Sequence, residues 1–210
     1  MSYCAIVVFK DSKPSLYEEF RNSWGGAARI WTALYDLYLK DPVTPHDSWM
    51  TDGGKRLWAL VDDVRLSDMS KSVLLSTFDR AVVLREHFDQ FTRDLRAFDK
   101  AFPMADCVSH LESWARFIDS LKSDKEAMAV GFYGTSCGED LFSKWDEDTD
   151  EEIPYDLDKD DRHFSVYAEE EPTRLKTDRC DHPSHDNPGL ITLCPECEKH
   201  EYQREEPSGD

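Results

Sequence analysis

SKSVLLSTFDRAVVLREHFDQFTRDLRAFDKAF, residues 70–102, carries the strongest periodic pattern in the chain and decides the fold that we expect. Apolar residues recur every three or four positions, with Arg, Asp and Glu between them, as on the buried stripe of an amphipathic helix. The stripe consists of Leu74, Phe78, Ala81, Phe88, Phe91, Leu95, Phe98 and Phe102. We therefore expect one long central helix over residues 70–102, against which the rest of the chain packs.

Three shorter stretches with helical character surround this segment. Residues 27–38 place apolar side chains at intervals of three and four, and residues 55–62 form a further short helix. A third helix is expected over residues 111–121, because Ser109 followed by Glu112 matches the capping box that opens many helices. Together these segments make a block of helices.

Strand signals lie on both sides of the helical block, near residues 3–9, 128–134 and 163–168. Each is short and contains β-branched or aromatic residues, as strands do. Separated strands with helices between them are typical of the α+β class. We expect a small, mostly antiparallel sheet that helices cover on one face.

The chain is expected to have two parts of unequal size. Residues 1–171 would form the α+β domain, within which residues 146–161 are an acidic loop. Residues 172–210 would form a small zinc-ribbon-like appendage and a polar tail. A segment so short and so poor in core residues needs a metal or another staple to fold.

The net charge of −19 is concentrated in the C-terminal third of the chain. From Glu139 to the end there are 24 acidic and 8 basic residues, so this stretch contributes −16, whereas the first 138 residues contribute −3. Direct binding to nucleic acid or to an anionic membrane is disfavoured, because both require clustered Lys and Arg.

The first ten residues, MSYCAIVVFK, lack the basic start and long apolar run of a secretory signal peptide. No window of the sequence approaches the roughly 20 consecutive apolar residues of a transmembrane helix. We therefore expect a cytoplasmic protein, whose six cysteines stay reduced. In that setting cysteine spacing indicates metal binding rather than a disulfide framework.

The densest acidic stretch is residues 146–161, which contain ten acids and one base. Mutual repulsion and few apolar anchors predict a solvated loop, or an acidic surface that a partner orders. We expect the carboxylates to bind a basic protein. The candidate partner-binding residues are Asp146, Glu147, Asp148, Asp150, Glu151, Glu152, Asp156, Asp158, Asp160 and Asp161.

The strongest chemical signal is CDHPSH at residues 180–185 followed by CPECEKH at residues 194–200. A C-x-x-C turn lets two thiolates meet one ion, and a second pair of ligands completes a tetrahedral zinc site. The pattern is similar to zinc-ribbon and zinc-knuckle segments in general. Four protein ligands would leave no open position for water, so the expected Zn²⁺ is structural.

The expected zinc ligands are Cys180, His182, Cys194 and Cys197. His185 and His200 are alternatives to His182, and the spacing does not choose among the three. A redox role for the CPEC pair is disfavoured, because redox C-x-x-C motifs open a helix that follows a strand.

A second motif, GTSCG at residues 134–138, directly follows an expected strand. It resembles the G-x-S-x-G turn of serine hydrolases, in which Ser136 would attack and His163 or His110 would act as the base. Those enzymes build this turn on successive βα units, which this chain lacks. A Gly-rich turn that ends a strand is the alternative interpretation.

We expect a non-enzymatic interaction protein rather than an enzyme. Its carboxylates would imitate the charge of nucleic acid and occupy the basic groove of a nucleic-acid-binding protein, which would make it an inhibitor. In charge and size it is similar to the small acidic proteins with which phages and mobile elements block restriction or CRISPR systems. A zinc-stabilised assembly adaptor and a serine hydrolase at Ser136 are the alternatives.

Removing zinc should unfold the C-terminal appendage and leave the main domain folded, because the metal supplies the folding energy of such small segments. A chelator, or replacement of Cys194 and Cys197 by Ser, should have the same effect. Limited proteolysis with mass spectrometry tests this, with rapid cleavage expected only beyond Arg174. Undiminished protease resistance of that segment in metal-free protein would contradict the site.

Overall fold

The computed structural model describes residues 3–21, 26–40, 54–103, 109–133, 141–146 and 148–167. The chain divides into two units, Met1–Glu169 and Glu170–Asp210, and every described residue belongs to the first. The expected appendage, residues 172–210, therefore lies outside the described residues.

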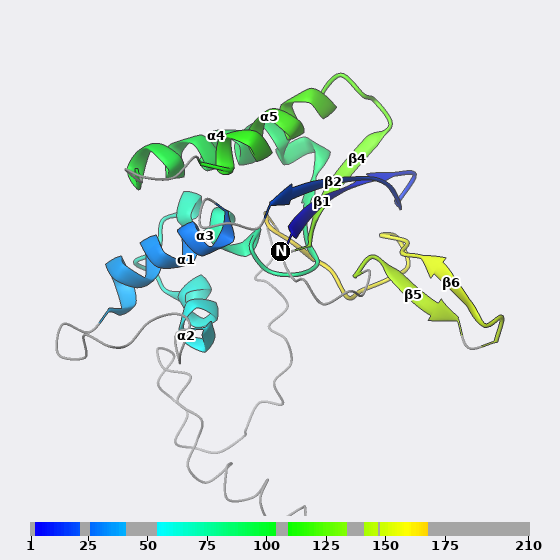
Figure 1. Cartoon of the computed structure of the whole chain (residues 1–210), viewed down its shortest axis with the longest axis horizontal. Helices are drawn as coiled ribbons and strands as arrows, with labels where there is room; N and C mark the ends of the chain where they lie inside the picture. Colours follow the sequence, from blue (N-terminus) through cyan, green and yellow to red (C-terminus); the bar gives the residue numbers. More distant parts are fainter. Residues whose placement is uncertain are drawn as a thin grey trace, which may run out of the picture. The chain divides into compact units, whose positions relative to one another are not determined.

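Within the described residues, five strands form one sheet in the first unit (Figure 1). Their order is β2-β1-β4-β3-β7, and neighbours are antiparallel except for β3 and β7, which are parallel. The strands are β1 (Tyr3–Lys10), β2 (Lys13–Arg21), β3 (Ala81–Leu84), β4 (Ala127–Tyr133) and β7 (Phe164–Ser165). The α+β class is confirmed, and the sheet is mixed.

The helices gather on one side of this sheet (Figure 1). The α-helices are α1 (Ala27–Leu34), α2 (Gly54–Ala59), α3 (Asp68–Leu75), α4 (Phe88–Ala101) and α5 (Leu111–Leu121). The shorter turns are the π-helical η1 (Tyr35–Leu39) and the 3-10 helices η3 (Leu60–Asp62) and η4 (Arg85–His87). The helices expected over residues 27–38, 55–62 and 111–121 are therefore confirmed.

The prediction of a single helix over residues 70–102 is wrong. α3 ends at Leu75, the four residues Ala81–Leu84 form β3, and α4 begins at Phe88. Ala-Val-Val-Leu pairs with β4 on one side and β7 on the other, and its first three residues are buried. A strand buried on both faces consists of consecutive apolar residues. Periodicity alone cannot distinguish such a run from part of a buried helix.

One strand was not predicted, and another is shorter than predicted. The turn after β1 was expected, but β2 was not: Asp11 and Ser12 both have positive φ, and they form the two-residue loop of a hairpin that returns as β2. β2 is an edge strand with mostly exposed side chains, so it lacks a clear apolar alternation. The strand expected over 163–168 contains only Phe164–Ser165.

Both faces of the sheet are buried, which the prediction of a one-sided sheet missed. Side chains alternate between the faces along each strand. The helical face carries Cys4, Ile6, Val8, Ala81, Val83, Val130 and Phe132. The opposite face carries Val7, Phe9, Val82 and Ala129, and these pack against Phe142 and Tyr155.

Residues 146–161, expected to be a solvated loop or an acidic surface that a partner orders, contain a hairpin followed by a turn, and most of their described side chains are exposed. β5 (Ser143–Asp146) and β6 (Glu151–Pro154) pair as an antiparallel hairpin, which forms a second, two-stranded sheet. The physical reason is the pair of aromatic residues that flank the hairpin: Phe142 and Tyr155 are fully buried. They supply the apolar anchors that the strands of the hairpin lack.

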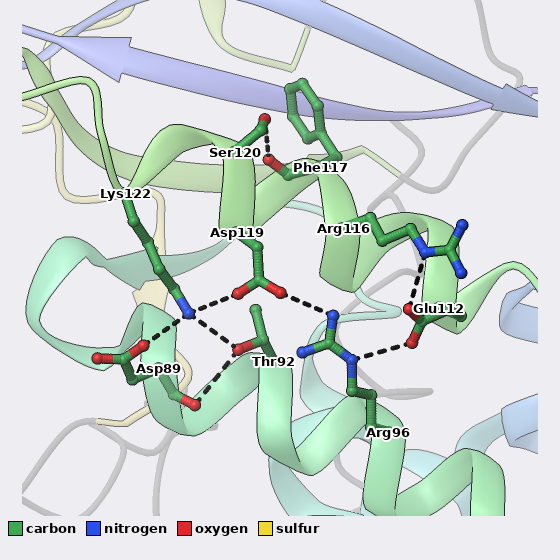
Figure 2. Close-up of polar contacts among 9 residues, drawn as sticks. All are labelled: Asp89, Thr92, Arg96, Glu112, Arg116, Phe117, Asp119, Ser120 and Lys122. Carbon is green, nitrogen blue, oxygen red and sulfur yellow. Dashed lines mark hydrogen bonds and ion pairs between the residues drawn. The ribbon is translucent and has the colours of Figure 1, made fainter.

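Ion pairs join α4 and α5 (Figure 2). Arg96 of α4 contacts Glu112 of α5 at 2.9 Å (Nε to Oε2) and Asp119 of α5 at 2.7 Å (Nη2 to Oδ2). Lys122, just after α5, contacts Asp119 and also reaches Asp89 of α4 at 2.6 Å (Nζ to Oδ1). Partly exposed ion pairs of this kind contribute little individually to the stability of the fold. The apolar faces of α4 and α5 therefore hold the two helices together, and the ion pairs fix their alignment.

Replacement of Gly131 by Ala should destabilise the first unit by about 1–3 kcal/mol, as overpacking of a core does. A Cβ on Gly131 would lie 2.6 Å from the ring of Phe142 and 2.9 Å from that of Phe9. Urea unfolding followed by tryptophan fluorescence measures the change. Met128→Ala on the same strand is the control, because Met128 is exposed and its loss should change stability little. Equal stability of Gly131→Ala and wild type would contradict this packing.

Candidate partner-binding surface

The acidic stretch folds into two pieces, which we name the acidic hairpin (residues 143–154) and the acidic turn (residues 156–161). Of the ten predicted partner-binding residues, nine are described, and Glu147 lies outside the described residues. In Figure 1 the hairpin lies on the opposite side of the sheet from α4 and α5.

The base of the acidic hairpin is fixed by two aromatic rings. The backbone N–H of Tyr155 donates to the carbonyl of Phe142 at 2.9 Å, which extends the hairpin ladder into the core. The ring of Phe142 meets the rings of Phe9 and Tyr155 edge to face, with centroids 5.1 and 5.6 Å apart. Such aromatic pairs add to the stability that burial provides, so the hairpin has a rigid root.

A polar cluster surrounds the hydroxyl end of Tyr155. Its oxygen lies 3.1 Å from Nδ1 of His163, and the guanidinium of Arg162 lies 5.2 Å from the centroid of its ring. Burial lowers the pKa of His163, and contacts with Asp160 only partly oppose this. Burial likewise raises the pKa of Tyr155. Both side chains are therefore neutral near pH 7.

The acidic turn is tied to the loop between β1 and β2. The hydroxyl of Ser12 donates to a carboxylate oxygen of Asp158 at 2.6 Å, and the backbone N–H of Leu157 donates to the carbonyl of Ser12 at 2.8 Å. These bonds connect residues about 145 positions apart in the chain. The turn consequently has a defined position on the body of the first unit.

Two carboxylates of the acidic turn are used within it. Asp156 pairs with Lys159 at 2.7 Å, and Asp160 pairs with Lys144 of the hairpin at 3.2 Å. The hydrogen bond from Lys159 lowers the pKa of Asp156. The backbone N–H of Asp156, followed by Lys144, lowers the pKa of Asp160. These two acids stabilise the turn rather than offering free charge.

The register of the hairpin places acids opposite one another or opposite an aromatic ring. Asp146 faces Glu151, and Trp145 faces Glu152. Like charges directly across a hairpin are destabilising. Asp146 offsets part of that cost by accepting the backbone N–H of Asp148 at 3.0 Å, as in an Asx turn. The hairpin is therefore folded despite the repulsion between its own carboxylates.

Six carboxylates of the acidic hairpin and acidic turn are exposed and form no ion pair with any described residue, although two of them accept a hydrogen bond from a serine. They are Asp148, Asp150, Glu151, Glu152, Asp158 and Asp161. Charge of one sign with nothing to balance it in the described part makes this surface a source of negative potential.

The ion network between α4 and α5 is the opposite case (Figure 2). Its three acids face three bases, so it has no excess charge. Hydrogen bonds from Arg96 and Arg116 lower the pKa of Glu112; burial raises that of Asp119, but hydrogen bonds from Lys122 and Arg96 outweigh it and lower the pKa. The members are Asp89, Glu112, Asp119, Arg96, Arg116 and Lys122. Such a balanced network fixes helices, and it gives a charged partner no net attraction.

The other predicted sites lie outside the described residues. These include the zinc ligands Cys180, His182, Cys194 and Cys197, and the GTSCG motif at residues 134–138. The zinc site therefore stays a prediction. His163, considered as a base for Ser136, contacts Tyr155 in the structure. Among the described residues, no cluster of His, Cys, Asp or Glu is arranged to hold a metal ion.

Sequence reasoning missed the residues that build this surface. Phe142 and Tyr155 flank the hairpin symmetrically about its turn, and this spacing was the available signal for a hairpin. Trp145 was also missed, although an exposed aromatic residue beside an acidic run is typical of a binding surface.

Comparison with protein-family models, curated proteins and solved structures found no significant match to this chain. No helix in the described part of the chain combines the length and the apolar character needed to cross a membrane. The surface is therefore interpreted from its own residues.

The first unit should lose stability as the pH falls below about 6.5 because of His163. Its pKa is lower in the folded state, so below the ordinary value the unfolded chain binds a proton that the folded chain does not. Stability from this group is complete above pH 6.5 and declines as the pH falls toward the folded pKa. Urea unfolding of wild type and His163→Gln between pH 7.5 and 5.5 measures this. Identical slopes in the two proteins would refute it.

Proposed function

We propose that this chain is a non-enzymatic interaction protein that binds a basic protein through the acidic hairpin and acidic turn. The bound surface of the partner is one that contacts nucleic acid, and the chain acts as an inhibitor by occupying it. The observation that carries the proposal is an array of unbalanced carboxylates on a hairpin whose root is buried.

The anchoring of the acidic hairpin and acidic turn lowers the entropic cost of binding a partner. A disordered acidic loop would lose conformational entropy when a partner ordered it. Here Phe142 and Tyr155 hold the root of the hairpin, and the bond from Ser12 to Asp158 holds the turn. A partner therefore meets carboxylates that are already positioned, and more of the electrostatic attraction is available for affinity.

The internal repulsion favours a cationic partner over a neutral one. Asp146 and Glu151 face each other across the hairpin, and Asp148 and Asp150 lie in the turn between them. Lys or Arg side chains of a partner would relieve this repulsion on binding, a gain that exists only in the complex. The same negative field speeds the encounter with a basic surface at low salt.

A nucleic-acid-binding groove has the required complementarity. Such grooves carry clustered Lys and Arg that contact closely spaced phosphates, and they bind largely through charge. Residues directly opposite on adjacent strands have Cβ atoms about 5 Å apart, so acids on a hairpin form a dense anionic array of similar character. A protein that occupies the groove in this way excludes nucleic acid by competition.

Neutralising the acidic hairpin should abolish capture of the partner. The test variant carries Asp146→Asn, Asp148→Asn, Asp150→Asn, Glu151→Gln and Glu152→Gln. The charge-matched control carries Glu18→Gln, Glu19→Gln, Asp62→Asn, Asp68→Asn and Glu86→Gln, all exposed and outside the hairpin. Both variants and wild type are used as bait in a nuclease-treated lysate, and captured proteins are identified by mass spectrometry.

Wild type and control should capture the same basic nucleic-acid-binding protein, and the hairpin variant should not. Added duplex DNA should release that protein, and capture should weaken steeply between about 50 and 200 mM salt. Capture of the same protein by all three baits, or capture indifferent to salt and DNA, would refute the proposal. Dependence on Cys194 and Cys197 instead would favour the zinc-stabilised adaptor.

A further inference from the structure

Trp145 occupies an unusual position on the acidic hairpin. It is 60% exposed, more than any other described Trp or Phe side chain. Successive residues of a strand alternate between faces, so Trp145 shares its face with Ser143, Glu152 and Pro154. Phe142 and Tyr155, which are buried against the sheet, lie on the other face. The ring is therefore presented outward.

No ring–ring or cation–π contact joins Trp145 to another described residue. Trp58 differs, although it is 48% exposed, because it stacks on Phe78 with ring centroids 3.4 Å apart and planes 7° apart. Trp58 thus covers the core with one of its faces. Trp145 has no comparable role in the fold.

The surroundings of Trp145 select a cation. Glu152 lies directly opposite on the neighbouring strand, and among the described residues its carboxylate accepts a hydrogen bond from Ser143 and forms no ion pair. Lys144, the nearest base in sequence, lies on the other face and pairs with Asp160. An exposed π-face beside a carboxylate binds a cationic side chain well, and a planar guanidinium can both stack on indole and contact the carboxylate.

The same chain already contains this combination beside the acidic turn, between an exposed arginine and a buried ring. The guanidinium of Arg162 lies over the ring of Tyr155, with Asp160 close by in the acidic turn. A second copy of the chain is a poor occupant for the outward face, because each copy carries a net charge of −19. Charge complementarity therefore favours an arginine-bearing partner.

We propose that Trp145 and Glu152 form the anchor that receives an arginine side chain of the partner. This inference rests on the proposed function and adds a specific contact to its electrostatic attraction. The carboxylates of the hairpin tip attract the partner over distance. Trp145 supplies the short-range contact that distinguishes arginine from lysine, because the guanidinium plane stacks on the indole ring and an ammonium does not.

Labelled nona-arginine and nona-lysine peptides are the probes, and fluorescence anisotropy gives their dissociation constants for the full chain. Trp145→Ala should weaken nona-arginine binding about 5- to 30-fold and nona-lysine binding less. Trp145→Leu, which keeps apolar area without an aromatic face, should behave like Trp145→Ala, whereas Trp145→Phe should fall between wild type and Trp145→Ala. Trp58→Ala is the matched control and should bind both peptides like wild type.

The indole N–H signals in a nitrogen-15 NMR spectrum locate the contact. The Trp145 signal, assigned by its loss in Trp145→Phe, should shift with the same midpoint as nona-arginine binding, while the Trp58 signal stays in place. Wild-type affinity of Trp145→Ala together with an unmoved Trp145 signal would overturn this inference alone. Wild-type affinity of Trp145→Leu would overturn the stacking contact. Wild-type affinity of the hairpin-neutralised protein would overturn the proposed function as well.

Discussion

The structure depends on a sheet whose central strands are buried on both faces. β1, β3 and β4 place side chains alternately toward the helices and toward the opposite side, and both sets need apolar cover. The helices cover one face. The other is covered by Phe142 and Tyr155, and Gly131 leaves the space into which the Phe142 ring fits. The acidic hairpin is folded because its two ends complete this second core.

Charge is balanced in one part of the first unit and unbalanced in another. Between α4 and α5 each acid has a base, and the network aligns two helices without giving them a net field (Figure 2). On the hairpin the acids outnumber the bases, and several have no basic partner in the described part. A hairpin that keeps Asp146 opposite Glu151 gives up stability. The proposed binding of a basic partner would relieve this repulsion.

Prediction from the sequence was accurate where local pattern and burial agree. Four elements were predicted because each has one unbroken apolar pattern of a single period, helical or alternating. They are β1, β4, α1 and α5. The segment between α3 and α4 was misassigned, since Ala81–Leu84 is apolar throughout and fits a helical stripe by coincidence. The fold of the acidic stretch was not predicted, because its anchors are two single aromatic residues, Phe142 before the stretch and Tyr155 within it, whose burial against the sheet is not a local property of the sequence.

The sequence by itself determined the α+β class, the extreme acidity of the C-terminal third and the position of the acidic stretch, because composition and short-range periodicity are local properties. Only the tertiary structure decided that this stretch is a hairpin, that Phe142 and Tyr155 hold it, and that Trp145 points away from the core. These features depend on contacts between residues far apart in the chain, such as Phe9 with Phe142 and Ser12 with Asp158. Such contacts form only once the second face of the sheet exists.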